Sequence, residues 1–204
     1  MKYFDKSNAL SRIAENKEKI ILELGCGNSK QFQNSIAIDL IDLNGVDIIC
    51  DLNLGFPFIP DNSVDEIHSS HFMEHVSDFG FIIKEIYRIL KPNGTNFMII
   101  PHFSNPYFYS DYTHKNHFGL YSISYFSKSD YFTRRIPAFY NEIDFDIINI
   151  HITFKSRWII NRVLLKIFEK LINSNRKFQE YYEANLCYAI PAYELSFLIN
   201  KRNV

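Results

Sequence analysis

The side chains best suited to chemistry are concentrated in one segment near the middle of the chain. Residues 101–119 contain three histidines (His102, His114 and His117) and Asp111 among many aromatic residues. The segment has neither strand nor helix periodicity, so we expect a long loop, and such loops are usually functional. An imidazole titrates near neutral pH and can take a proton from a hydroxyl, while a carboxylate can orient its ring. His114 oriented by Asp111 is therefore the preferred candidate for a general base.

A second reactive group is formed by His71, Glu74 and His75. His71 with Glu74 is the second candidate for a catalytic base. The spacing His-x-x-Glu-His is also that of inverted zinc metallopeptidases, and on a helix the two histidines would share a face. No third ligand is evident, so a metal-dependent hydrolase remains an alternative and we assign no metal ligands. The plainer interpretation is the start of a helix, with Glu74 near its N-terminal dipole.

A turn with two glycines could form the floor of a cofactor site. Residues 20–24 are predicted as a buried strand, and Gly25 and Gly27 follow at once. Ligands of open parallel sheets bind beyond the carboxyl ends of the strands. A dinucleotide fingerprint would need a third glycine where Lys30 stands, and the polar run 28–35 has room for only about a turn or two of helix. The turn therefore favours a cofactor without a pyrophosphate.

Acidic residues accompany the first three predicted strands. Glu23 lies within the first, where its carboxylate could hold the amino group of a ligand or orient the glycine loop. Asp39 lies near the end of the second, residues 36–40, and could accept hydrogen bonds from both hydroxyls of a ribose. Asp51 follows the third, residues 46–50. For the two aspartates the plainer alternatives are a cap, a turn or a solvated loop.

The order of these features resembles that of class I S-adenosylmethionine-dependent methyltransferases. The resemblance is carried by residues 23–27 (Glu-x-Gly-x-Gly), by 56–65 (Phe-Pro-Phe-x-Pro-Asp-Asn-Ser-Val-Asp) and by 86–94 (Ile-Tyr-Arg-Ile-Leu-Lys-Pro-Asn-Gly). Residues 111–114 resemble the Asp-x-Thr-His segment of a subgroup often encoded with polysaccharide-synthesis enzymes, with Tyr112 where many relatives have Pro. The likeness covers residues 20–119 well and the remainder loosely.

The resemblance implies a methyltransferase that uses S-adenosylmethionine and releases S-adenosylhomocysteine. In the family, the residue matching Asp51 meets the adenine amino group and the one matching Leu52 packs on the ring. The implied acceptor is a small molecule or a glycan-linked group, methylated at a hydroxyl oxygen. A non-catalytic partner subunit that binds the cofactor remains an alternative. The cofactor-binding residues are expected to be Glu23, Gly25, Cys26, Gly27, Asp39, Leu40, Asp51, Leu52, Ser70 and His71.

The elements that must position these residues predict one α/β domain. By analogy, we expect a three-layer, Rossmann-like fold with a seven-stranded, mostly parallel sheet whose last strand is antiparallel. The domain would span residues 1–204, with a core at 18–156 and a C-terminal helix and closing strand at 157–204. Residues 5–19 are expected to form a short helix or arm at one edge. Further strands are predicted at 64–70, 97–101 and 144–154, with a helix at 79–90 and a turn at 91–94.

The bulk composition argues against several other classes of protein. The formal net charge of −1 gives no general basic field for nucleic acid. The three cysteines are isolated, so neither a disulfide framework nor a zinc site is indicated. No signal core or bilayer-spanning run is evident, and we expect a cytoplasmic protein. Residues 157–177 form a basic, amphipathic segment, predicted to dock internally or form a homodimer, with peripheral membrane contact as the alternative.

Overall fold

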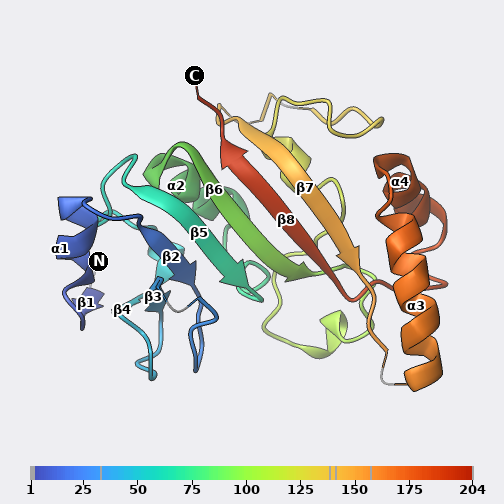
Figure 1. The fold of residues 1–204 in the computed structure, drawn as a ribbon, viewed down its shortest axis with the longest axis horizontal. Helices are drawn as coiled ribbons and strands as arrows, with labels where there is room; N and C mark the ends of the chain where they lie inside the picture. The colour runs from blue at the N-terminus through green and yellow to red at the C-terminus, as the bar shows by residue number, and fades with distance from the viewer. Residues whose placement is uncertain (1–2, 33, 138, 141, 157, 204) are drawn as a thin grey trace.

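An eight-stranded β-sheet is the framework of the computed structural model, which describes residues 3–32, 34–137, 139–140, 142–156 and 158–203. Its strands are β1 (Tyr3–Asp5), β2 (Ile21–Leu24), β3 (Ile36–Asp39), β4 (Ile48–Cys50), β5 (Val64–Ser70), β6 (Leu90–Pro101), β7 (Phe145–Thr153) and β8 (Glu194–Lys201). The α-helices of the described residues are α1 (Ala9–Glu15), α2 (Phe79–Ile89), α3 (Ile159–Ile172) and α4 (Arg176–Asn185). Across the sheet the strands follow the order β1-β4-β3-β2-β5-β6-β8-β7 (Figure 1).

The sheet confirms the predicted Rossmann-like architecture. Strands β4, β3, β2, β5 and β6 run parallel, and β8 lies between β6 and β7, antiparallel to both. The last strand is therefore antiparallel, as predicted. The described residues form eight strands rather than seven, because β1 pairs antiparallel with β4 at the sheet edge. The short helix expected within residues 5–19 is α1.

The first three parallel strands are buried because their side chains are apolar on both faces. Such continuous apolar runs are typical of parallel strands covered on both sides. The strands therefore hold the residues at their carboxyl ends in fixed positions. The aliphatic side chains exposed by no more than 1% in these strands are Leu22, Leu24, Ile36, Ala37, Ile38 and Ile48.

Helix α2 forms where the spacing of apolar residues predicts a helix at 79–90. The Asp78 carboxylate caps it by accepting a hydrogen bond from the Phe81 N–H at 2.9 Å. The helix ends at Ile89, one residue before the predicted end, because Leu90 begins β6. Its buried side chains are Ile82, Ile83, Ile86 and Ile89.

The turn predicted at residues 91–94 lies within β6. Leu90 already pairs with Val64 of β5, and regular pairing resumes where Thr95 lies opposite Glu66. The intervening residues make a local irregularity in the register and do not end the strand. The strand predicted at 97–101 therefore begins earlier than its apolar residues indicate, because backbone pairing with β5 does not require apolar side chains.

Two segments expected to contain helical structure form turns instead. The described part of residues 28–35, between β2 and β3, has no helix, and residues 71–76 form a turn that precedes α2. His71 has a φ of 52°, a left-handed conformation that an α-helix excludes. The interpretation of the His-x-x-Glu-His spacing as one face of a helix is therefore wrong.

After β7 the chain forms two helices, although the sequence analysis predicts only one. Helix α3 corresponds to the predicted one, whose first residue, 157, lies outside the described residues. Helix α4 was missed: Asn175 caps it by accepting from the Phe178 N–H at 3.1 Å, and the buried Tyr182 anchors it to the loop before β8. Both helices lie beyond β7, at one end of the sheet (Figure 1).

Helix α3 leaves much of its apolar face uncovered. Among the described residues, no helix of the protein is both long and apolar enough to cross a bilayer. The side chains more than half exposed on α3 are Val163, Leu164, Ile167 and Leu171.

Candidate active site

A cleft of about 530 Å³ lies beyond the carboxyl ends of β2, β3, β4 and β5. The parallel register of these strands brings their ends to one edge of the sheet, which is where ligands of such folds bind. Seven of the expected cofactor-binding residues line the cleft. They are Gly25, Gly27, Asp39, Leu40, Asp51, Leu52 and His71; the other described lining residues are Ile41, Asn53, Phe72, His75, Val76, Thr113 and Lys115.

The two glycines of the turn meet different constraints. Gly25 has a φ of 67°, and a Cβ placed there would lie 2.7 Å from the Phe72 ring. Gly27 has a φ of 59°, but a Cβ there would have no described neighbour within 4 Å. The Gly27 N–H donates to Asp39 Oδ2 at 2.9 Å, so the turn is tied to the end of β3. Gly25 is required by packing, whereas Gly27 leaves the cleft open to a ligand.

Asp39 and Asp51 lie on the cleft side of their strands. Asp39 accepts hydrogen bonds from the Gly27 N–H and, at 3.1 Å, from the Ile41 N–H. A carboxylate has about four lone-pair positions, so it retains capacity for the hydroxyls of a ligand. Asp51 caps the short helix Leu52–Leu54 by accepting from the Asn53 N–H at 3.0 Å. Both aspartates thus form the local hydrogen bonds of the plainer alternatives, a turn at Asp39 and a cap at Asp51. Each carboxylate can still bind a ligand in the cleft.

Glu23 acts on the glycine loop and does not line the cleft. Its buried carboxylate accepts hydrogen bonds from the Gln31 N–H at 2.9 Å, from the Phe32 N–H at 3.3 Å and from the Ser35 hydroxyl at 2.9 Å. Of the two roles considered for Glu23, these contacts match the orientation of the loop. The carboxylate replaces the peptide hydrogen bonds that a helix would have supplied in this segment.

Cys26 and Ser70 are the other expected residues outside the described cleft lining. Burial, together with the nearby Asp39 and Glu23 carboxylates, raises the pKa of Cys26 to about 11, so this thiol is protonated and unreactive at neutral pH. Ser70 ends β5, opposite Ile99 of β6.

His71 is held between two carboxylates. Its Nε2 lies 3.4 Å from Glu194 Oε2, and its Nδ1 lies 3.3 Å from Glu74 Oε1. Hydrogen bonding to Glu194 and then to Glu74 raises the pKa of His71 to about 9. The imidazole is therefore a cation at neutral pH. It is suited to donating hydrogen bonds and unsuited to accepting a proton from a substrate.

Asp111 orients a different histidine from the one the sequence analysis favours. Asp111 Oδ2 lies 3.7 Å from His114 Nε2, which is too long for a hydrogen bond. The Thr113 hydroxyl instead donates to Asp111 Oδ1 at 2.5 Å and lies 2.9 Å from His75 Nδ1. Because the hydroxyl proton is directed to Asp111, the hydroxyl oxygen accepts from His75 Nδ1–H. Asp111, Thr113 and His75 thus form a hydrogen-bonded chain that ends in the cleft.

His114 lies against the far side of His75. The two ring centroids are 4.9 Å apart, and His114 Nδ1 lies 2.9 Å from the Phe108 carbonyl oxygen. A carbonyl only accepts, so His114 Nδ1 carries a proton and donates this hydrogen bond. The sequence analysis does not identify His75 as a residue that lines the cleft together with Thr113. The His-x-x-Glu-His pattern had drawn attention to it, but its partner Thr113 is distant in sequence.

His102, the fully buried histidine of the 101–119 loop, has a structural role. His102 is fully buried, with Nδ1 2.7 Å from the Ser104 hydroxyl and Nε2 3.2 Å from Glu183. These contacts join the loop to α4. His102 therefore supports the loop that carries Thr113 and His114.

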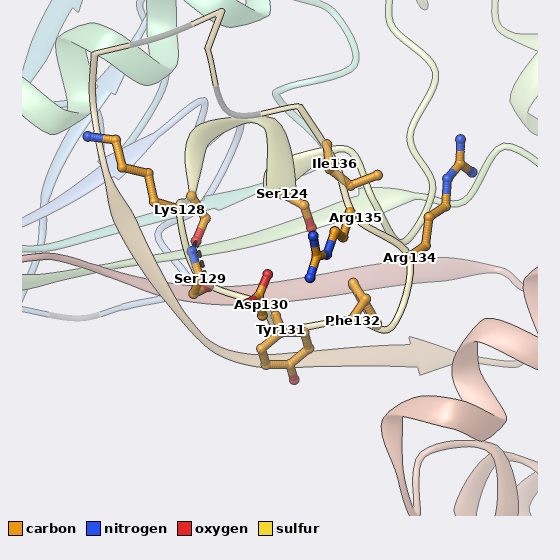
Figure 2. A pocket seen from close by; sticks show the side chains of 10 residues that line it. Ser124, Lys128, Ser129, Asp130, Tyr131, Phe132, Arg134, Arg135 and Ile136 are labelled. Carbon is orange, nitrogen blue, oxygen red and sulfur yellow. Dashed lines mark hydrogen bonds between the residues drawn. The ribbon is translucent and has the colours of Figure 1, made fainter.

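A separate hollow of about 330 Å³ lies in the loop after the short helix Ile123–Phe126 (Figure 2). Its described lining includes Ser124, Lys128, Asp130, Arg134 and Arg135. None of the expected site residues belongs to this described lining. The cleft at the strand ends is therefore the candidate active site.

The topology and the cleft together define the class I S-adenosylmethionine-dependent methyltransferase fold. Residues 46–98 match the family described as methyltransferase domain, which confirms the resemblance noted in the sequence. A search of curated proteins finds no significant match.

Solved structures with the same fold cover nearly the whole chain. A SAM-dependent methyltransferase from Archaeoglobus fulgidus is 15% identical, with a TM-score of 0.59 over 96% of this chain and 94% of that one. A phosphoethanolamine N-methyltransferase 2 from Haemonchus contortus, in complex with phosphomonomethylethanolamine and S-adenosylhomocysteine, is 16% identical, with a TM-score of 0.50 over 97% of this chain and 53% of that one.

A third similar structure is that of a cyclase, so the fold alone does not identify the reaction. The [4+2]-cyclase SpnF is 16% identical, with a TM-score of 0.53 over 97% of this chain and 82% of that one. At these identities the structures speak for the fold, while the choice of acceptor depends on the site of this chain. The fold and the domain match agree on the methyltransferase class.

Proposed function

We propose that this protein transfers the methyl group of S-adenosylmethionine to a hydroxyl oxygen of a small-molecule acceptor. The observation that carries the proposal is the cleft that collects Gly25, Gly27, Asp39 and Asp51 at the ends of three adjacent strands. The cofactor supplies an electrophilic methyl group, so the protein must mainly position an oxygen in line with it at about 3–3.5 Å.

The residues present fit this cofactor. Asp39 retains lone pairs for ribose hydroxyls, and Gly27 opens the floor of the cleft because no Cβ stands there. Asp51 and Leu52 match the adenine-binding positions of the family. His71 directly follows β5 and lines the cleft, and we place it beside the methionine portion of the cofactor.

The acceptor hydroxyl would meet the pair of imidazoles at the other end of the cleft. His75 faces the cleft, and both His75 and His114 have Nδ1 engaged and Nε2 available. General-base assistance is worth about 10²–10⁴-fold, and orientation can supply more. These two lone pairs are therefore assigned to the acceptor hydroxyl.

A neighbouring cavity of about 520 Å³ supports a glycan-linked or anionic acceptor. Glu194 connects it to the cleft, because its carboxylate contacts both His71 Nε2 and Lys155 Nζ, the latter at 3.0 Å. Aromatic faces suit sugar rings, and paired basic side chains suit a phosphate or carboxylate. The described lining contains Tyr107, Trp158 and Tyr193 together with Lys155 and Arg162.

The exposed apolar face of α3 supports an interaction beyond this chain. Leu164 and Ile167 are 61% and 65% exposed, and Lys166 and Lys170 belong to the same helix. A homodimer contact, or peripheral contact with an anionic membrane that carries the acceptor, would use this face.

Calorimetric titration with S-adenosylhomocysteine tests the proposal. We expect micromolar binding by the wild-type protein, and binding weakened at least tenfold in Asp39→Ala. Asp42→Ala is the matched control, because Asp42 is an exposed acid three residues away that pairs with Lys6 outside the cleft. Absence of binding by folded wild-type protein, or equal binding by both variants, would contradict the proposed cofactor site.

A further inference from the structure

We propose that Glu74, His75 and His114 bind a divalent transition-metal ion at the acceptor end of the cleft. One ligand atom from each residue lies within 4.8 Å of the other two. The sequence analysis groups His71 with Glu74 and His75 instead. His71 does not belong to the set proposed here, because its two ring nitrogens contact the carboxylates of Glu74 and Glu194.

Backbone hydrogen bonds hold the two contributing segments together. The Glu74 carbonyl accepts from the N–H groups of Lys115 and Asn116, at 2.7 and 3.2 Å. The Asn116 side-chain amide donates to the Val76 carbonyl at 2.7 Å. The turn that carries Glu74 and His75 is thus joined to the loop that carries His114. The three side chains meet because of this junction.

Both imidazoles are prepared as metal ligands. His75 Nδ1–H donates to the Thr113 hydroxyl, and His114 Nδ1–H donates to the Phe108 carbonyl. In each ring Nε2 is therefore the nitrogen that is left for a metal ion. Metal-bound histidines are usually fixed in this way, with the second ring nitrogen donating to a carbonyl or carboxylate.

One buried carboxylate oxygen of Glu74 lacks a hydrogen-bond partner among the described residues. Its side chain is 1% exposed, and Oε1 contacts His71, but Oε2 has no hydrogen-bond partner among the described residues. A buried carboxylate oxygen without a partner is costly. The carboxylate also faces the imidazoles, since Oε1 lies 4.0 Å from His75 Nε2. A cation bound by both carboxylate oxygens would give Oε2 a partner.

The donor set selects the kind of ion. Two imidazole nitrogens and one carboxylate oxygen are the protein ligands of several catalytic zinc sites, and imidazole favours transition metals over Mg²⁺. Zinc–ligand distances of about 2.0–2.2 Å would require the three atoms to approach one another by about 1 Å. A catalytic zinc site of this kind keeps an open coordination position. That position would face the cleft, because His75 lines the cleft.

The catalytic consequence rests on the proposed function. An acceptor hydroxyl bound to the ion would have a lowered pKa and lose its proton to solvent. The oxygen would then form the bond to the methyl carbon as the methyl–sulfur bond breaks, and S-adenosylhomocysteine would leave. The two imidazole lone pairs thus act on the hydroxyl through the ion.

Calorimetric titration of chelator-treated protein with Zn²⁺ tests the site. We expect one Zn²⁺ per chain in the wild type and an affinity reduced by more than about a hundredfold in His114→Ala and Glu74→Gln. Thr113→Val, which removes the partner of His75, should reduce the affinity by about 10–100-fold. His117→Ala is the matched control, because His117 is an exposed histidine of the same loop outside the cluster.

Circular dichroism of each variant confirms that it is folded, and S-adenosylhomocysteine binding is measured on the same samples. Absence of stoichiometric Zn²⁺ binding, or equal affinity in His114→Ala and His117→Ala, overturns the metal site. If S-adenosylhomocysteine binds while Zn²⁺ does not, only this inference fails. If Zn²⁺ binds through the three residues while S-adenosylhomocysteine does not, only the proposed function fails.

Discussion

At the scale of single residues, the two glycines at the floor of the cleft are required for different reasons. At Gly25 both the positive φ and the Phe72 ring exclude a side chain, whereas at Gly27 only the φ is restrictive. The two positions therefore serve stability and ligand access to different degrees.

We predict that Gly25→Ala and Gly27→Ala differ in what they impair. A left-handed alanine costs about 1–2 kcal/mol, and a close contact in a packed site adds about 1–3 kcal/mol. Gly25→Ala should therefore lower the free energy of unfolding by about 2–5 kcal/mol, and Gly27→Ala by about 1–2 kcal/mol. Because the Cβ of Gly27→Ala enters the open cleft, this variant should lose S-adenosylhomocysteine affinity while remaining folded. Urea unfolding and calorimetry check both effects, and equal destabilisation by the two substitutions would contradict the packing argument.

At the scale of elements, side chains replace the helix that many related folds place between β2 and β3. On one side, Glu23 accepts hydrogen bonds from Gln31, Phe32 and Ser35, as described above. Asp47 acts from the other side: its Oδ2 accepts from Lys30 Nζ at 2.5 Å and from the Ala37 N–H at 2.8 Å. Lys30 also donates to the Ser35 carbonyl. A short polar connection is thereby fixed without regular structure.

We predict that Asp47→Asn destabilises the protein in a pH-dependent way. Burial opposes ionisation of Asp47, but the hydrogen bonds from Lys30 and Ala37 outweigh it and hold the pKa of the carboxyl below its usual range. A carboxyl whose pKa is lowered by folding stabilises the protein above its unfolded-state pKa of about 3.9, and this contribution is lost as the pH falls through the folded-state value. We expect a loss of about 1–3 kcal/mol at pH 7, shrinking below about pH 4.

Urea unfolding of both proteins from pH 7 downward measures this difference. Asp42→Asn serves as the control, because its ion pair with Lys6 is largely exposed and should contribute at most about 1 kcal/mol. A loss in Asp47→Asn that persists unchanged at the lowest pH would show that the charge of Asp47 is not its source.

At the scale of the whole molecule, the C-terminal strand β8 joins β7, at one edge of the sheet, to β6. Strand β8 pairs with β6 from Thr95↔Asn200 to Pro101↔Glu194 and with β7 along its other edge. Its inward side chains Leu195, Phe197 and Ile199 are fully buried. The sequence analysis places this segment after the core as a closing strand. Among the described residues, β8 is the strand through which β7 pairs with the rest of the sheet.

We predict that a chain ending at residue 193 does not fold. Its β6 and β7 would lose their shared partner and expose apolar side chains that β8 covers. Circular dichroism and thermal unfolding should show no cooperative transition. Deletion of residues 1–4 is the comparison, because β1 is a short, exposed edge strand, and it should retain a cooperative transition. A cooperative, native-like transition in the shortened C-terminal variant would refute the prediction.

The sequence alone determined the features that depend on local pattern. Apolar runs placed β2, β3 and β5 within a residue or so, and apolar spacing placed α2. The glycine turn and the acidic residues after the strands followed from the same reasoning, since parallel strands bring their carboxyl ends to one edge. Helix α4 was missed because its low content of apolar residues gives a weak helical pattern around the buried Tyr182.

Only the tertiary structure decided which side chains act together. The sequence analysis pairs Asp111 with His114 because a carboxylate can orient an imidazole. In the structure Thr113 links Asp111 to His75, which lies 38 residues before Thr113 in the chain. His71 was a candidate base until two carboxylates, one from β8, made it a cation. Local pattern carries propensity and burial, whereas protonation and ligand geometry depend on contacts between distant segments, which form only when the sheet and its loops are assembled.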